Sequence, residues 1–232
     1  MSYATKALLV ALLFPSFIWA QGKDPDVLLA QASRRGDLYN WADAEPLFGE
    51  AQRLYSERGD ARNALYARIG HIRSTMEQLS LPETSATLDS ELQNNPLLKS
   101  DKQIRLFCLA VKGDIDGELD SKPMRRDWEE VLELARDLGD KKWQNRASGE
   151  IGFAAFLEGD VAKAQQMVAG TLIAAMLSGD AGAQIRYLAA IGSGLALTGL
   201  PDQALGYFDR AANIAAQNPD SGYQFLIYTG NL

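Results

Sequence analysis

The sequence predicts an all-α protein, an α-solenoid built from stacked helix-turn-helix repeats. Three observations predict this fold class. Ala and Leu together make up 65 of the 232 residues, whereas Val, Ile and Thr make up 24, and such a ratio favours helix because β-branched side chains lose rotamer freedom there. Turn signals recur about every 40 residues. Between them, apolar residues recur at three- and four-residue steps, the period of a helix face.

The composition excludes several classes of protein. The net charge is −7, so the chain lacks the basic excess that is typical of a nucleic-acid binder. The single cysteine, Cys108, excludes an internal disulfide framework and a Cys-rich zinc module. The single histidine, His71, excludes any site that needs two imidazoles. Apolar residues flank Cys108 on both sides, which predicts a buried thiol.

The first twenty residues are predicted to be a secretory signal peptide. Lys6 precedes an unbroken apolar run over residues 7–14, and the chain turns polar after Ala20, where we expect cleavage. An uncleaved anchor is the alternative, but the apolar stretch of residues 7–20 is shorter than the ~20 residues of a spanning helix. We therefore expect an exported bacterial protein, periplasmic or secreted, with one domain over residues 21–232 and no membrane span in that domain.

Turn signals divide residues 21–232 into five units and the start of a sixth. No Ser- or Gly-rich linker separates the units, so we expect one continuous domain. The junctions are Gly59-Asp60, Ser100-Asp101, Gly139-Asp140, Gly179-Asp180 and Pro219-Asp220.

Each unit is predicted to be a helix, a turn and a second helix. The first unit has helices over about residues 26–35 and 41–57, and the second has one over about 61–78 and a partner that begins at Leu81-Pro82 and ends near residue 94. In the third unit we expect a helix over residues 101–112, a break at Gly113-Asp114, and the longest irregular stretch of the chain before a helix over about 124–138.

The fourth and fifth units align without a gap at an offset of 40 residues. In the fifth unit, Gly199 and Pro201 mark the turn, because Gly accepts a positive φ past a helix end and Pro suits the first turn of the next helix. Two helices with one apolar face each cannot bury those faces alone, so the units must stack. The identical pairs are Arg146/Arg186, Ile151/Ile191, Gly152/Gly192, Leu157/Leu197, Gly159/Gly199 and Ala164/Ala204.

This pattern resembles the tetratricopeptide repeat, whose first helix carries Leu-Gly and whose second carries Ala, an aromatic residue and Ala. The period here is about 40 residues rather than the usual ~34. The third unit departs most, and we expect Trp128 at a position that Ala normally holds. In the fifth unit the matching residues are Leu188, Ile191, Gly192, Leu195, Ala204, Phe208, Ala211 and Pro219.

The resemblance implies a concave groove, lined by the first helices of the units, that binds a peptide or partner protein. Arg146 and Arg186 would then share one wall and could bind the carboxylate of an acidic or C-terminal peptide. The alternative is that each arginine pairs with an Asp or Glu of the adjacent repeat. The groove positions implied by the resemblance are His71 in the second unit, Arg146, Gly149, Phe153 and Phe156 in the fourth, and Arg186, Ala189, Ser193 and Ala196 in the fifth.

The residues contain no constellation that predicts catalysis. A phosphate loop is absent from the sequence, and Ser193, although it lies between two glycines, lacks the spacing of a hydrolase elbow. The acidic run of Asp114, Asp116, Glu118 and Asp120 lacks the glycine and closing glutamate of an EF-hand. We therefore expect no enzyme activity within these residues, no cofactor and no bound metal.

The apolar segment 223–232 is predicted to open a sixth unit whose second helix is missing. We expect further repeats or another domain after Leu232; the alternatives are that this short helix caps the array or supports a dimer contact. The leading prediction for function is a non-catalytic scaffold for protein–protein interaction. The alternative is the N-terminal sensing or docking arm of a larger exported enzyme, since similar repeats precede caspase-like CHAT peptidase domains.

Overall fold

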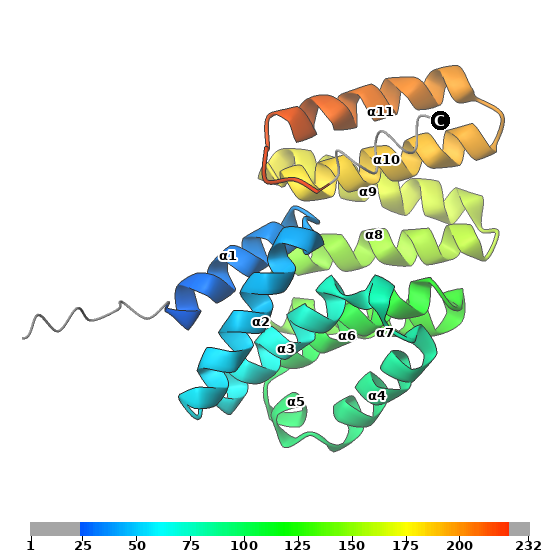
Figure 1. Cartoon of the computed structure of the whole chain (residues 1–232). Coiled ribbons are helices and arrows are strands. Elements are labelled where there is room, and N and C mark those ends of the chain that lie inside the picture. The colour runs from blue at the N-terminus through cyan, green and yellow to red at the C-terminus, as the bar shows by residue number, and fades with distance from the viewer. Residues whose placement is uncertain (1–23, 223–232) are drawn as a thin grey trace, which may run out of the picture.

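The computed structural model describes residues 24–222, and it confirms the predicted all-α solenoid (Figure 1). No strand occurs in this range. The helices are α1 (Pro25–Asp37), α2 (Trp41–Glu57), α3 (Ala61–Ser74), α4 (Leu81–Asn94), α5 (Pro96–Ser100), α6 (Lys102–Gly117), α7 (Ser121–Asp137), α8 (Lys141–Leu157), α9 (Val161–Ser178), α10 (Ala181–Leu197) and α11 (Pro201–Ala216).

The Gly-Asp junctions work as a helix stop followed by a helix start. Gly179 has φ +70° and ends α9 in the left-handed region, which glycine adopts without strain. The side chain of Asp180 then accepts a hydrogen bond from the Ala183 backbone N–H at 3.0 Å and caps α10. This pair of residues explains why the repeat period is visible in the sequence.

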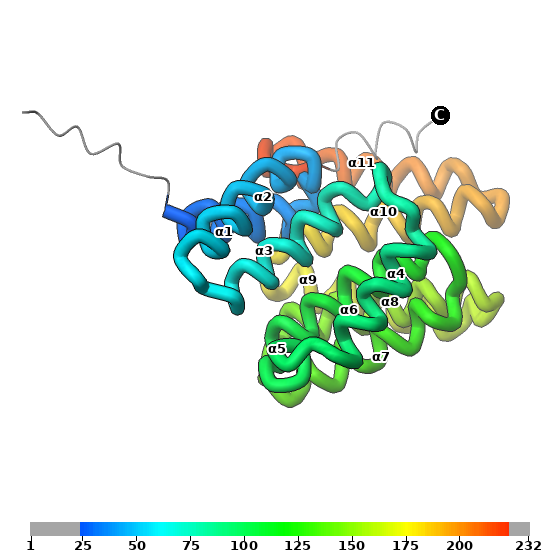
Figure 2. The backbone as a smooth tube through the Cα atoms, turned by 60° about the horizontal axis from the view of Figure 1, so that its bottom comes forward, coloured from blue at the N-terminus to red at the C-terminus, as the bar shows by residue number. Residues whose placement is uncertain are grey.

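Most helices pack on their neighbours along the chain, and α4 is the exception. The pairs α1–α2, α2–α3, α6–α7, α7–α8, α8–α9 and α10–α11 make the largest contacts. α4 instead packs mainly on α6, and α3 also reaches α6 (Figure 2). The two helices of the second unit, α3 and α4, therefore do not pack on each other as a pair, and α4 lies against the third unit.

A glycine at the twelfth position of four first helices lies against a side chain of the helix that follows, and for three of them that side chain is aromatic. A Cβ at Gly192 would lie 2.9 Å from the ring of Phe208, and one at Gly113 would lie 2.7 Å from the indole of Trp128. Trp128 therefore takes the position of the filling aromatic residue, eight residues into its helix like Phe208, and the expectation that it replaces Ala is wrong. The four glycines are Gly36, Gly113, Gly152 and Gly192.

The loop predicted around Gly113-Asp114 is wrong, because α6 continues without interruption to Gly117. Gly113 serves close packing on Trp128 there and does not end the helix. α7 begins at Ser121, where the Asp120 side chain caps it, so the connection is short. In the second unit, a 3₁₀ turn over Met76–Gln78 follows α3, and the short helix α5 was not predicted.

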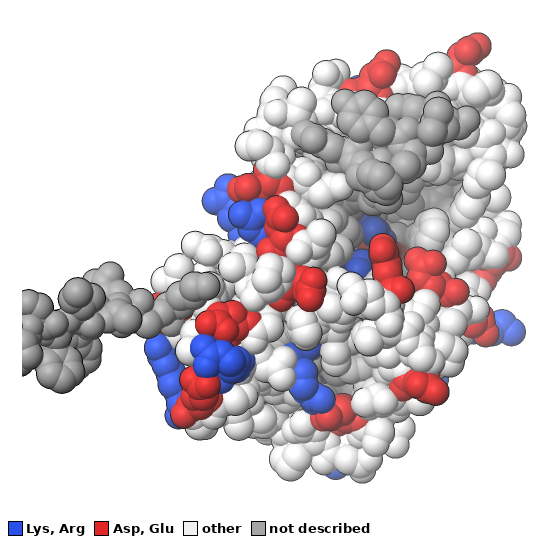
Figure 3. All heavy atoms as spheres, in the orientation of Figure 1, with Lys and Arg blue, Asp and Glu red and all other residues white. Residues whose placement is uncertain are grey.

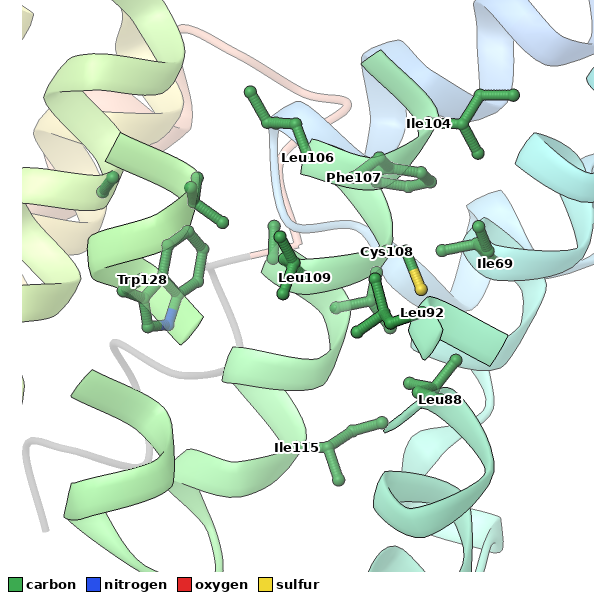
Figure 4. Close-up of a cluster of buried hydrophobic side chains, with 14 of the residues drawn as sticks. Ile69, Leu88, Leu92, Ile104, Leu106, Phe107, Cys108, Leu109, Ile115 and Trp128 are labelled. Atoms are coloured by element: carbon green, nitrogen blue, oxygen red, sulfur yellow. The ribbon is translucent and has the colours of Figure 1, made fainter. Parts of the chain in front are cut away.

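The largest apolar core gathers around α6, and Cys108 lies fully buried within it. The Cys108 sulfur points toward Ile69 and Leu92, with Trp128 on the other side of Leu109 (Figure 4). Burial raises the pKa of the Cys108 thiol to about 12. The predicted buried cysteine is thus confirmed.

The first and last described units touch, because the corner between α1 and α2 reaches α10. A Cβ at Gly182 would clash with the backbone carbonyl of Asp37. The Asn40 side chain donates to the Asp220 carbonyl oxygen at 3.1 Å, and the Gly222 N–H donates to the Leu38 carbonyl oxygen at 3.2 Å. These contacts hold the α1–α2 corner against the fifth unit.

The predicted signal peptide, residues 1–20, and the apolar segment predicted to open a sixth unit, residues 223–232, lie outside the described residues. Between residues 24 and 222, none of the helices combines the length and the apolar character that crossing a membrane requires.

Candidate partner-binding groove

A chain of ion pairs crosses the inner face of the solenoid from α3 to α10. Asp114 on α6 accepts from Arg73 on α3 at 2.6 Å and from Arg146 on α8 at 3.0 Å. One unit further, Glu150 on α8 accepts from Arg186 on α10 at 2.6 Å. Arg146 and Arg186 therefore each pair with an acidic residue of the preceding unit. The alternative that each arginine pairs with an acidic residue of the adjacent repeat is therefore confirmed, and both guanidiniums are engaged with carboxylates of the chain itself.

Burial and charge act in opposite directions on these groups. Burial alone would raise the pKa of the Asp114 carboxyl, but Arg73, Arg146 and Arg186 together hold it below its usual value. Only 6% of the Asp114 side chain and 1% of the Glu150 side chain are exposed. Both carboxylates are held in the wall by their arginines, and Asp114 stays ionised at neutral pH.

Tyr39, at the α1–α2 corner, inserts between the two repeat arginines. The guanidinium carbons of Arg146 and Arg186 lie 5.4 Å and 4.9 Å from the centre of its ring, within the range of cation–π attraction. Tyr39 is the one residue other than glycine between residues 24 and 222 with a positive φ, at +56°. Burial raises the pKa of its phenol, although both arginines oppose this shift.

Next to this corner lies a hollow of about 620 Å³, which we call the inner groove. Figure 3 shows basic atoms within a recess near the middle of the molecule and acidic atoms at its edge. Five large apolar side chains take part in the lining, which suits a ligand with apolar side chains. The lining residues are Tyr39, Asn40, Trp41, Ala42, Arg73, Met76, Glu77, Leu81, Gly113, Asp114, Gly117, Glu118, Met124, Glu150, Phe153, Arg186 and Gly222.

Two residues of the inner groove carry a buried polar atom that has no hydrogen-bond partner: Oε1 of Glu150 is an acceptor and Nε1 of Trp41 is a donor. A buried polar atom without a partner costs about 1–3 kcal/mol. The wall of the inner groove thus contains one unpartnered acceptor and one unpartnered donor, both beneath its surface. Arg146 has an unpartnered Nε too, but it lines a separate cavity of about 30 Å³, room for one water molecule.

A larger hollow of about 800 Å³ lies where the end of α1 meets α7, α8 and the α9–α10 turn. Its lining contains none of the buried unpartnered atoms found in the described part of the chain. This hollow therefore contains no buried polar atom that a ligand would satisfy, and the inner groove is the stronger candidate for a binding site.

The structure brings Arg186 and Phe153 into the inner groove, and Phe153 is 39% exposed there. Arg146 lies beneath Tyr39, outside the lining, and Gly149 is covered by the Tyr187 ring. The remaining predicted positions lie elsewhere on the helices, outside the lining of the inner groove. They are Phe156 and Ala189, both half-buried, Ser193 and Ala196, both exposed, and His71, whose Nε2 lies 3.8 Å from a Glu45 oxygen on α2.

Sequence reasoning missed Arg73, Glu150, Tyr39 and Trp41 as parts of this region. Arg73 and Asp114 are 41 residues apart, close to one repeat period, so opposite charges at that spacing were a usable signal. The insertion of Tyr39 had no such signal, because it depends on how the first unit closes against the fifth.

A second buried ionic cluster joins α4, α6 and α7. The Lys112 ammonium, 1% exposed, lies 2.6 Å from Asp116, 2.8 Å from Asp127 and 3.4 Å from Asp89. The Ser85 hydroxyl donates to Asp116 at 2.5 Å. All of these groups have partners, so the cluster attaches α4 to the third unit, and Asp116 is a helical residue in it rather than part of a calcium loop.

No protein-family model matches the chain, and no curated protein matches its sequence. Membership of the tetratricopeptide family therefore stays a prediction from the repeat pattern.

Proposed function

We propose that this chain is a non-catalytic scaffold that binds a polypeptide segment of a partner protein in the inner groove. The observation that carries the proposal is the pair of unpartnered buried atoms, Glu150 Oε1 and Trp41 Nε1, in one groove. A polypeptide has N–H donors and carbonyl acceptors along its backbone, so one segment can satisfy both atoms.

The apolar lining supports the same proposal. Met76 and Met124 adapt their shape to different side chains, and Phe153 leaves part of its ring exposed to solvent. A volume of about 620 Å³ accommodates a few side chains of a bound segment. The repeats are proposed to be tetratricopeptide-like, with the difference that the corner residue Tyr39 fills part of the inner face.

The test is to select binders for the full chain from a random peptide library and to measure their affinity by fluorescence anisotropy. We expect Phe153→Ala to weaken binding at least about tenfold, since it removes a central apolar contact. Leu177→Ala is the matched control, because Leu177 is 86% exposed on α9 and does not line the inner groove. Equal affinity of the Phe153 variant and the unmodified chain would refute binding in the inner groove.

A further inference from the structure

The inner groove has an unbalanced charge. Its lining holds four acidic and two basic residues, which gives a net charge of −2. The acidic residues are Glu77, Asp114, Glu118 and Glu150, and the basic ones are Arg73 and Arg186.

Both basic groups are already engaged with the wall. Arg73 binds Asp114 and also lies 4.6 Å from the centre of the Trp41 ring, and Arg186 binds Glu150. These contacts neutralise Asp114 and one oxygen of Glu150. An acidic ligand would therefore have to displace an internal ion pair, and that disfavours the carboxylate ligand predicted from the repeated arginines.

The carboxylate oxygens of the inner groove have fewer partners than its arginines do. Oε1 of Glu150 is buried without a partner. Glu77 and Glu118 are exposed lining residues, which we call the rim carboxylates, and neither takes part in an ion pair among residues 24–222. The inner groove thus has three carboxylates with an oxygen left without a partner in the described part of the chain, Glu150 buried in its wall and Glu77 and Glu118 exposed.

We propose that the segment bound in the inner groove is apolar and carries a lysine or arginine whose N–H groups bind Glu150 and the rim carboxylates. This inference rests on the proposed function and adds the chemistry of the partner. The apolar residues Trp41, Met76 and Phe153 hold the flanking side chains, while a charged donor at Glu150 satisfies an atom that the packing of the chain leaves unpaired. Charge complementarity of this kind sets specificity.

The experiment uses three labelled, N-acetylated and C-amidated peptides of sequence Gly-Leu-Phe-X-Leu-Phe-Gly, with Lys, Gln or Glu at X, titrated into the full chain at low salt. We expect the Lys peptide to bind at least about tenfold more tightly than the Glu peptide, with the Gln peptide between them. A Glu or Gln peptide that binds as tightly as the Lys peptide overturns the inference. The same holds if none of the three binds saturably.

Three variants locate the preference. Glu77→Gln with Glu118→Gln should reduce the Lys-over-Glu ratio to below about threefold, since both rim charges are removed. The control is Glu129→Gln with Glu133→Gln, which removes two exposed charges of α7 that line none of the hollows described above and should keep the ratio. Glu150→Gln should reduce the ratio too.

Glu150→Gln could lower the helical content, and in that case only the variant with Glu77→Gln and Glu118→Gln tests the inference. An unchanged Lys-over-Glu ratio in that variant overturns the inference. The proposed function is tested separately, because the library peptides and Phe153→Ala report binding in the inner groove whatever its charge preference.

Discussion

Replacing Gly192 by Leu tests the packing rule that defines the repeats. A Cβ at this position would lie 2.9–3.1 Å from three ring atoms of Phe208, whereas ordinary carbon contacts are ~3.5–4.0 Å. Phe208 is only 5% exposed, so its ring cannot move into solvent without losing its own burial. We expect an overpacking cost of about 1–3 kcal/mol in the free energy of unfolding.

Gly194→Leu supplies the matched control two residues along the same helix. A Cβ there would meet nothing within 4 Å, so this variant is expected only to gain helix propensity, by at most the ~0.8–1.0 kcal/mol that separates Gly from Ala. The same gain offsets part of the cost at Gly192. The two variants should therefore differ by about 1–3 kcal/mol, or by about 2–4 °C in Tm for each kcal/mol in a chain of this size.

Thermal and guanidinium unfolding followed by circular dichroism measures this difference. A double variant with Phe208→Ala should recover part of the loss at Gly192, because the ring that is overpacked is then absent. If Gly192→Leu is as stable as Gly194→Leu, the alignment of glycine against the filling aromatic residue is refuted.

Three further outcomes follow from the buried polar and thiol groups. Lys112→Met should cost about 3–5 kcal/mol in guanidinium unfolding, because it leaves buried carboxylates without their cation; a cost below about 1 kcal/mol would contradict that. Burial raises the pKa of Asp127 to about 6 despite Lys112, so between about pH 4 and 6 the folded chain holds more protons than the unfolded one. The contribution of Asp127 to stability should therefore fall as the pH rises through this window, and Asp127→Asn should remove that contribution; the same pH dependence in the variant would argue against the assignment. The Cys108 thiol, with its pKa raised to about 12, should react with a thiol reagent at about pH 8 only as fast as the chain unfolds; rapid labelling of the native chain would show that it is accessible.

The sequence predicted the fold correctly at the turns, where a residue acts only on the backbone next to it. Gly179 followed by Asp180 stops one helix and caps the next, so the turns recur visibly in the chain. Gly113-Asp114 is the same dipeptide, but it lies inside α6, where Gly113 leaves room for the Trp128 indole. Whether a glycine ends a helix or packs within it depends on the residue that lies against it in the folded chain, and that residue cannot be identified from a single sequence.

The inner groove was less predictable because its residues come from distant units. The repeat offset correctly placed Arg146 and Arg186 near each other, and both flank Tyr39. The offset could not reveal that a corner more than 100 residues earlier in the chain would occupy the space between them. The resemblance to the tetratricopeptide repeat implied four groove positions on α10, whereas Arg186 is the one α10 residue in the lining and most of the other lining residues lie on or near α3, α6 and α8 or at the α1–α2 corner.

The inner ion pairs have a role in geometry more than in stability. A buried pair loses hydration of both charges and contributes little net free energy, but breaking it is costly. Asp114 joins Arg73 of the second unit to Arg146 of the fourth, and Glu150 joins the fourth unit to Arg186 of the fifth. These pairs fix the relative positions of α3, α6, α8 and α10, all of which contribute residues to the inner groove. They also leave Glu150 with one oxygen unused, so the residues that set the shape of the inner groove are the same ones that set which charge it can receive.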